Sequence, residues 1–321
     1  MVVAGFPRIP GDTMAAKKKS LETDFDWIRR VTMNEPRGHR DMFGCVLVDA
    51  VDPTADTAAV FMDGGQFYNM CGHASLGISG MMVETGRVAT TGRVTFVKID
   101  TPAGLVEGKV SSDGYGKIED VSLVDVPSFV FALDEVVQVE FFGEVRVDVA
   151  YGGNIFVIAE AADMGFVSID PEYTNELIKA GIALRKAANE QLKFVHPERP
   201  HIDRIDIAML TGEPSSDAAD ARNIAILGDA QVDRSPCGTG TCARMALLHA
   251  RGELAVGEKF CHESSIRTVF DGRILEEVDV GGISGVRPEI SCRPFLTGFS
   301  DLVVDPDDPL RTGFVLGQAL R

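Results

Sequence analysis

Two cysteine–glycine pairs occupy equivalent places in the two halves of the sequence. Cys71-Gly72-His73 and Cys237-Gly238-Thr239 begin 166 residues apart, and each follows a strand-like segment and opens a short apolar segment. Each apolar segment ends at a glycine fifteen residues beyond its cysteine, Gly86 or Gly252, as expected of a helix C-terminal cap. The repeat continues downstream with two matching triplets, Gly108-Lys109-Val110 and Gly272-Arg273-Ile274. The pattern predicts two similar α/β halves, each presenting one thiol at a helix N-terminus.

A thiol in that position is suited to proton transfer. A helix N-terminus carries unsatisfied N–H groups and a partial positive charge, which favour a thiolate and bind anions such as carboxylates. Gly72 and Gly238 would let backbone amides approach a ligand closely. If the two halves face each other, one cysteine removes a proton from a carbon and the other returns one on the opposite face. Amides aimed at the carboxylate would stabilise the charge that develops. This arrangement predicts cofactor-independent inversion at the α-carbon of an amino acid.

Other kinds of site use the same residue types. A pair of buried structural thiols is the simplest alternative, and the repeat argues against it. A zinc site from Cys71, His73, Cys237 and Cys242 would need the closely paired ligands of structural zinc, which this spacing does not provide. The segment 238–240 lacks the rest of a dinucleotide fingerprint and the lysine of a phosphate-binding loop. A redox-active dithiol protein would require an easily formed Cys71–Cys237 disulfide. We therefore expect no metal and no cofactor.

Composition limits the range of partners. The chain has 321 residues, 45% hydrophobic and 25% charged, which is ordinary for a folded protein of about two domains. Its formal net charge is −17, so phosphate backbones and anionic membrane surfaces are poor electrostatic partners. No apolar run approaches the roughly 20 residues of a membrane span, and six cysteines are too few for a disulfide scaffold. We expect a cytoplasmic protein with a small-molecule substrate, no nucleic acid partner and no membrane contact.

The elements expected around the two cysteines are typical of a mixed α/β protein. Apolar residues at helical spacing predict helices over residues 20–33 and 171–192. Most of the segment from 94 to 149 reads as short strands. We divide the chain into a first domain of residues 1–127 plus 296–321, and a second domain of residues 128–295. The crossover then lies near Pro127, and a C-terminal strand is expected to return to the first domain.

The two cysteine segments also resemble a known family. Asn69-Met70-Cys71-Gly72-His73 and the segment from Asp233 to Thr241 resemble the two signatures of the proline racemase family. That family includes 4-hydroxyproline 2-epimerases and trans-3-hydroxyproline dehydratases. Two further segments are similar to family segments, Glu35-Pro36-Arg37-Gly38-His39 and Tyr151-Gly152-Gly153. The likeness runs from about Gly5 to the C-terminus.

The resemblance implies a fold, a mechanism and a set of contacts. The fold would be diaminopimelate epimerase-like, with two pseudo-symmetric domains that each wrap a curved mixed sheet around a central helix. Cys71 and Cys237 would be the two acid/base groups of cofactor-independent racemisation. Amides around Gly72-His73 and Gly238-Thr239 would hold the substrate carboxylate, and His73 and Asp233 would contact its nitrogen. A homodimer would be usual.

Two further residues bear on the substrate. Cysteine at both signature positions fits racemases and epimerases, and Phe43 matches a pocket aromatic associated with proline racemases. Leu227 falls where a second aromatic would be expected. An aromatic wall suits an unsubstituted ring, since burying an unpaired hydroxyl costs about 1–3 kcal/mol. Proline is therefore the expected substrate, with 4-hydroxyproline 2-epimerisation as the alternative. The resemblance also implies a segment ahead of Val2 that this sequence lacks, which leaves a non-catalytic binder of proline-like ligands as an alternative of another class.

Overall fold

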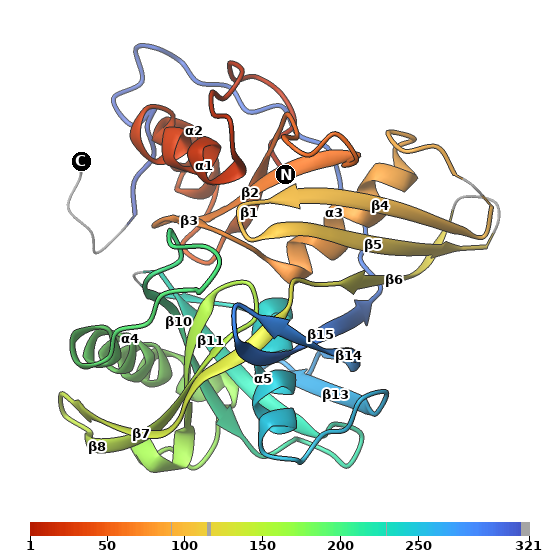
Figure 1. Cartoon of the computed structure of the whole chain (residues 1–321). Helices are drawn as coiled ribbons and strands as arrows, with labels where there is room; N and C mark the ends of the chain where they lie inside the picture. The colour runs from red at the N-terminus through yellow and green to blue at the C-terminus, as the bar shows by residue number, and fades with distance from the viewer. Residues whose placement is uncertain (91, 114–116, 229, 316–321) are drawn as a thin grey trace.

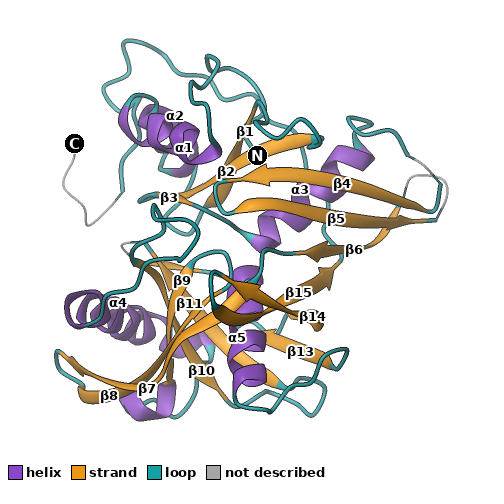
Figure 2. Cartoon of the chain, viewed as in Figure 1, coloured by secondary structure: helices purple, strands orange, loops and turns teal. Residues whose placement is uncertain are grey.

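The strands join into one connected sheet that runs through both halves of the molecule (Figures 1 and 2). The computed structural model describes residues 1–90, 92–113, 117–228 and 230–315. In the first half the strands pair in the order β1-β2-β4-β5-β6, with β3 beside β2. The bounds of these strands are β1 (Phe43–Val48), β2 (Thr57–Asp63), β3 (Phe67–Tyr68), β4 (Val94–Thr101), β5 (Gly104–Ser112) and β6 (Ile118–Val124).

The second half continues the same sheet in the order β15-β14-β13-β11-β10-β9-β8-β7, with β12 beside β11. Antiparallel pairing of β15 with β6 joins the halves. Three pairs are parallel, β2–β4, β9–β10 and β11–β13, so the sheet is mixed as expected. The bounds are β7 (Ser128–Val139), β8 (Gly143–Tyr151), β9 (Ile155–Glu160), β10 (Ile205–Gly212), β11 (Ala221–Leu227), β12 (Gln231–Val232), β13 (Lys259–Ser264), β14 (Val269–Val280) and β15 (Ile283–Cys292).

Each half folds around one buried helix. Helix α3 (Gly72–Glu84) lies against β4, β5 and β6, and helix α5 (Gly238–Ala250) lies against β7, β8, β14 and β15 (Figure 1). Both helices carry small and apolar residues on nearly every face, which is the pattern of a helix surrounded by protein. The sequence expectation of two α/β halves around central helices is confirmed.

The internal repeat is visible in the backbone. Gly86 and Gly252, the residues expected to end the two helices, both have positive φ, 70° and 75°. The downstream glycines are also equivalent, because each lets a strand pass close to its central helix. A Cβ on Gly108 would collide with Ser79, and one on Gly272 would lie 3.0 Å from Met245 Sδ. Ser79 and Met245 are each the eighth residue after the cysteine of their half.

The N-terminal helix differs from the prediction. Instead of one helix over residues 20–33, the chain forms α1 (Met14–Thr23) and α2 (Asp26–Met33), with Thr13 capping the first. Leu21 and Ile28 are buried in the same apolar cluster, so helical spacing continues across the break and conceals it. The predicted helix over 171–192 is confirmed as α4 (Thr174–Gln191), preceded by a short 3-10 turn.

The C-terminal segment returns to the first half, but no strand is described in residues 293–315. Hydrogen bonds to the first half hold it: Arg37 Nε donates to the Val303 carbonyl at 3.0 Å, Arg37 Nη1 to the Arg311 carbonyl at 3.3 Å, and Phe314 N to the Glu35 carbonyl at 3.0 Å. Residues 316–321 of the expected first domain lie outside the described residues. The division at residues 127 and 128 falls in the link between β6 and β7, and as a domain boundary it stays a proposal.

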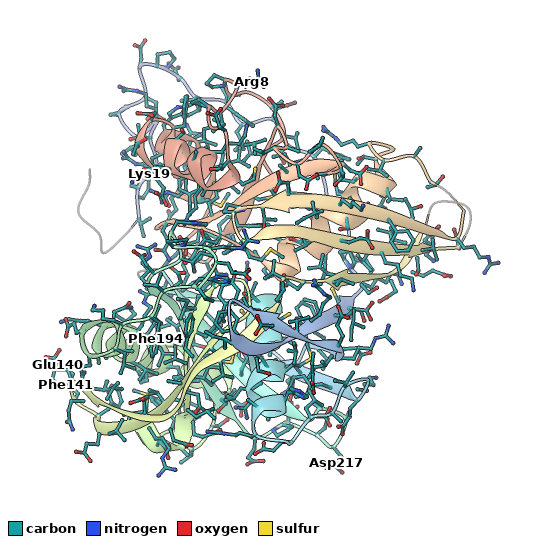
Figure 3. All side chains as sticks on the ribbon, in the orientation of Figure 1. Arg8, Lys19, Glu140, Phe141, Phe194 and Asp217 are labelled. Atoms are coloured by element: carbon teal, nitrogen blue, oxygen red, sulfur yellow. The ribbon has the colours of Figure 1, made fainter. Side chains whose placement is uncertain are left out.

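Many charged side chains lie on the surface. Arg8, Lys19, Glu140 and Asp217 project from the edges of the ribbon (Figure 3). In the described part of the chain, no helix combines the length and the apolar character needed to cross a membrane.

Candidate active site

The N-termini of α3 and α5 touch at the junction of the two halves. A Cβ atom on Gly72 would lie 2.9 Å from Gly238 Cα, and one on Gly238 would lie 2.6 Å from Gly72 Cα. Both separations are well inside van der Waals contact for two carbons, so only glycine fits at either position. In the structure these glycines let the two helix ends approach each other, and their predicted role in admitting a ligand stays a prediction. This contact brings the two preceding residues, Cys71 and Cys237, to the same junction between the halves.

Cys71 occupies the N-cap position of α3 in ordinary extended backbone geometry, with φ −147°. Its Sγ accepts a hydrogen bond from the Ala74 N–H at 3.4 Å. The sulfur thus accepts from an amide that has no partner within the helix. It lies at the helix N-terminus, the positive end of the helix dipole. The side chain is buried.

Cys237 opens α5 in a different conformation. Its φ is 66°, a region that strains residues with a Cβ unless neighbouring contacts hold it. The Cys237 N–H donates to Ser235 Oγ at 3.1 Å, and the Cys237 carbonyl accepts from Thr241 N at 2.7 Å. Burial, reinforced by the Asp233 carboxylate, raises the pKa of the Cys237 thiol well above its ordinary value. Burial therefore favours the neutral thiol of Cys237 over its thiolate.

His73 and Asp233 form an ion pair across the junction. His73 Nδ1 lies 3.6 Å from Asp233 Oδ1, and Ser235 Oγ lies 3.1 Å from the same nitrogen. Burial lowers the pKa of His73, but Cys71 and Asp233 together raise it well above its ordinary value. Burial raises the pKa of Asp233, but His73 and Ser235 lower it more, so the carboxyl is ionised. The predicted partners of the substrate nitrogen lie together, next to both cysteines.

Replacing Asp233 by asparagine should lower the pKa of His73. The substitution removes a negative charge 3.6 Å from the imidazole. In the native protein the raised pKa makes protonated His73 stabilising below its unfolded pKa, and this contribution disappears as pH rises through the folded pKa. Proton NMR titration of the His73 ring measures the change. Asp41→Asn, which borders the same cavity with its carboxylate beside Arg40, is the matched control. An unchanged His73 titration in Asp233→Asn would contradict the ion pair.

A small cavity opens beside this pair. Its volume is about 130 Å³, well below the roughly 300–1,000 Å³ of typical ligand pockets, so it suits a ligand the size of one amino acid. Four residues singled out in the sequence line it: Phe43, His73, Leu227 and Asp233. The Phe43 ring lies 5.6 Å from that of Tyr68 and 5.7 Å from that of His73, centroid to centroid. Phe43 thus places an aromatic ring in the wall of this cavity, and its contact with a substrate stays a prediction.

The other predicted residues lie behind the cavity and do not line it. Cys71, Gly72, Cys237, Gly238 and Thr239 are either at or next to the contact between the two helix ends. Sequence analysis missed Ser235 and Gln231, which also line the cavity. Ser235 lies within the second cysteine signature and Gln231 lies just before it, so closeness to that signature could have indicated both as site residues. Gln231 is 6% exposed, and its Oε1 has no hydrogen-bond partner among the described residues.

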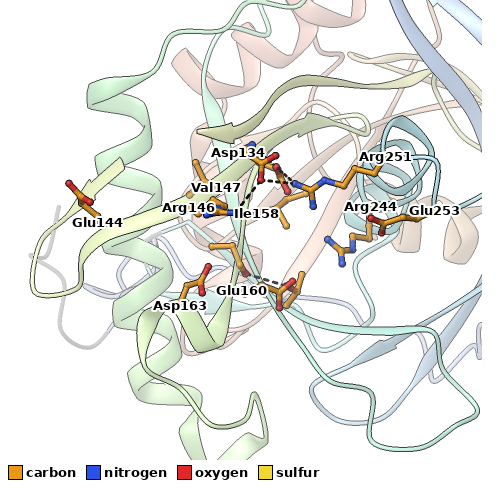
Figure 4. A pocket seen from close by; sticks show the side chains of 13 residues that line it. Asp134, Glu144, Arg146, Val147, Ile158, Glu160, Asp163, Arg244, Arg251 and Glu253 are labelled. Carbon is orange, nitrogen blue, oxygen red and sulfur yellow. Dashed lines mark hydrogen bonds and ion pairs between the residues drawn. The ribbon is translucent and has the colours of Figure 1, made fainter. Parts of the chain in front are cut away.

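A second, larger cavity of about 730 Å³ lies away from the cysteines (Figure 4). Charged side chains of β7, β8, β9 and the end of α5 line it, and none of the predicted site residues does. Arg251 Nη2 donates to Asp148 Oδ1 at 2.9 Å and to Asp134 Oδ1 at 3.2 Å, which ties the β7–β8 hairpin to α5. Within the described ranges, no group of three or more His, Cys, Asp or Glu residues is placed to hold a metal ion.

Two buried helices follow a cysteine each, a mixed sheet wraps around both, and their N-termini touch. This arrangement defines a diaminopimelate epimerase-like fold. The crystal structure of a PhzF-family phenazine biosynthesis protein from Bacillus anthracis is similar at TM-score 0.52 and 12% identity, over 84% of this chain and 85% of that one. At that identity the likeness concerns the fold alone.

The chain belongs to the proline racemase family, since the family model described as proline racemase matches residues 1–315. It is 43% identical to a proline racemase of Acetoanaerobium sticklandii, over 98% of this chain and 94% of the relative. It is 39% identical to a 4-hydroxyproline epimerase of Brucella ovis, over 98% and 93%. The structure of a hydroxyproline epimerase from Agrobacterium vitis with bound trans-4-hydroxy-L-proline matches at TM-score 0.91 and 34% identity, over 98% and 91%. The predicted family and fold are confirmed.

Proposed function

We propose that this protein is an amino-acid isomerase that racemises proline through two bases, Cys71 and Cys237. The contact between the two cysteine-bearing helix N-termini at Gly72 and Gly238 carries the proposal. The starts of two helices that each follow a cysteine meet there, and this supports a site in which thiols and helix-end amides act on a carbon next to a carboxylate. Relatives that cover nearly the whole chain are named proline racemase, which supports the same activity.

The proposed mechanism needs no change of oxidation state. Amides at the starts of α3 and α5 bind the substrate carboxylate and stabilise the charge that builds up on it. The Cys71 thiolate removes the α-proton of one enantiomer, and the protonated Cys237 thiol delivers a proton to the opposite face. The C–H bond broken on one face is replaced by a C–H bond on the other, and the two sulfurs exchange protonation states. For the opposite enantiomer the roles are exchanged: Cys237 is the base and Cys71 is the acid. The Asp233–His73 pair positions the substrate nitrogen.

Proline is the substrate that the cavity wall favours. Phe43 and Leu227 are apolar and line the cavity, so a plain pyrrolidine ring needs no polar partner there. One observation favours 4-hydroxyproline as a second candidate: Gln231 Oε1 is buried beside the cavity with no partner in the described part of the chain, so it can accept a hydrogen bond from a hydroxyl. The Agrobacterium vitis structure has trans-4-hydroxy-L-proline bound.

Proton NMR in D₂O tests the proposal directly. Purified, reduced protein is incubated separately with L-proline and with trans-4-hydroxy-L-proline, and loss of the α-proton signal is followed. Exchange of proline is the expected result. Exchange of hydroxyproline alone would keep the mechanism and overturn the substrate. Thermal stabilisation by either ligand without exchange would favour a non-catalytic binder.

Phe43→Ser should shift the preference towards hydroxyproline. A serine hydroxyl supplies a polar partner and removes the aromatic wall, so the ratio of kcat/KM for proline to that for hydroxyproline should fall about tenfold or more. Competition between the two substrates in one NMR tube measures that ratio. Phe96→Ser, a change at an exposed phenylalanine of β4, is the control and should leave it unaltered. An unchanged ratio in Phe43→Ser would remove Phe43 from substrate selection.

Two expectations about the whole protein remain proposals. We propose a homodimer, which light scattering at micromolar concentration would detect as twice the 34.5 kDa chain mass. We also propose a cytoplasmic location, because two catalytic thiols and the remaining four cysteines would stay reduced there.

A further inference from the structure

Asn154, in the loop between β8 and β9, reaches from the second half into the first. Its Nδ2 donates to the Met70 carbonyl at 2.7 Å, and Met70 immediately precedes Cys71. The same Nδ2 lies 3.5 Å from Thr239 Oγ1, two residues beyond Cys237. The asparagine is 1% exposed, so solvent does not compete for these contacts. One carboxamide therefore spans the starts of both cysteine-bearing helices.

Asn223, in β11, makes the equivalent contact at the other cysteine. Its Nδ2 donates to the Pro236 carbonyl at 2.9 Å, and Pro236 immediately precedes Cys237. The same nitrogen lies 2.9 Å from His262 Nε2 and 3.4 Å from His262 Nδ1. Asn223 is fully buried. Each cysteine thus follows a carbonyl that is held by a buried asparagine.

His262 lies between Asn223 and Thr241 and extends the contacts around Cys237. Burial, with a smaller effect of Arg244, lowers the pKa of His262 to about 3, so the ring is neutral. His262 Nδ1 lies 2.9 Å from Thr241 Oγ1, within hydrogen-bond distance. The Thr241 hydroxyl donates to the Cys237 carbonyl at 2.9 Å. Both peptide groups that flank the Cys237 Cα are therefore fixed, which is what its φ of 66° requires.

Neither asparagine is satisfied as a hydrogen-bonding group. Asn154 Oδ1 and Asn223 Oδ1 are both buried and have no partner among the described residues. A buried, unpaired amide oxygen destabilises a folded protein. A contribution to stability therefore does not explain why asparagine occupies these two positions. The need for a hydrogen-bond donor at each carbonyl does explain it.

We propose that Asn154 and Asn223 are positioning residues for the two cysteines, each fixing the peptide that carries one cysteine by holding the preceding carbonyl. The assignment deepens the proposed racemase function and rests on it. Neither asparagine transfers a proton. Asn154 also sets the separation of the two helix ends, because its contacts lie on both sides of the junction.

Asn154→Ala and Asn223→Ala test the assignment. A misplaced base reacts slowly even where substrate still binds, so we expect kcat for proline to fall about tenfold to hundredfold while KM changes far less. Asn189→Ala is the matched control. Its Nδ2 also donates to two carbonyls, of Arg185 at 3.0 Å and Ile205 at 2.9 Å, in partly buried hydrogen bonds that join α4 to β10. It should lower the melting temperature and leave kcat unaltered.

Site-resolved alkylation separates positioning from general loosening. Each folded variant is treated with iodoacetamide, and the rates at Cys71 and Cys237 are followed by mass spectrometry. Asn154→Ala should change the Cys71 rate more than the Cys237 rate, and Asn223→Ala should do the reverse, by about threefold or more. Equal changes at both cysteines, or a loss of kcat no larger than that of an Asn189→Ala protein with a similar fall in melting temperature, would overturn the proposal. Alkylation does not depend on turnover: if wild-type protein exchanges no α-proton, the racemase function fails, while the alkylation pattern still decides whether the asparagines position the thiols.

Discussion

Replacing either Cys71 or Cys237 by serine is expected to lower proline racemisation by at least about a thousandfold. A serine hydroxyl is a far weaker acid than a thiol, so it neither ionises to a base nor delivers a proton at a useful rate near neutral pH. Both substitutions should be almost equally severe, because each enantiomer needs one cysteine as base and the other as acid. Loss of the α-proton signal in D₂O measures turnover for each variant.

The fold should survive these two substitutions. Serine is close to cysteine in size, and the melting temperature of each variant reports any structural loss separately from turnover. Cys261→Ser is the matched control, since Cys261 lies partly exposed in β13, away from the junction. It should keep wild-type turnover. Wild-type racemisation by either Cys71→Ser or Cys237→Ser would refute the two-base mechanism.

Gly238→Ala is expected to disrupt both stability and activity. Its new methyl group would lie 2.6 Å from Gly72 Cα and 2.7 Å from His73 N. These are backbone atoms at the start of a buried helix, so no side-chain rotation relieves the overlap. Overpacking typically lowers the free energy of unfolding by about 1–3 kcal/mol, and the upper end is expected here. Moving the helix ends apart would also separate the two thiols, so turnover should fall by about a hundredfold or more.

Gly77→Ala in α3 provides the control for that experiment. A Cβ at Gly77 meets nothing within 4 Å, and the residue lies in helical backbone. Alanine there should raise the free energy of unfolding by about 0.5–1 kcal/mol, because it restricts the unfolded chain and favours helix. Urea denaturation of the two variants gives the comparison. A Gly238→Ala protein as stable and active as Gly77→Ala would show that the helix ends do not need to touch.

Much of the architecture was predictable because its determinants are local. The Cys-Gly steps, the apolar stretches that follow them and the glycines at 86 and 252 are sequence features of single helices, and the helices begin and end where those features indicate. Local patterns did not predict the break between two helices that bury the same apolar face. Leu21 and Ile28 pack into the same cluster, so spacing alone could not separate α1 from α2. The described part of the C-terminal segment pairs with the first half through one isolated bridge, Phe314 with Glu35, which depends on residues far away in the sequence.

The sequence by itself determined that two thiols would stand at helix N-termini in equivalent halves, since helix formation and capping depend on neighbouring residues. Only the tertiary structure decided that Gly72 would touch Gly238, that Asp233 would pair with His73, and that Asn154 would hold the carbonyl before Cys71. Each of these contacts joins residues more than eighty positions apart. Their existence depends on how the whole sheet folds and how the two central helices pack within it, which no local pattern encodes.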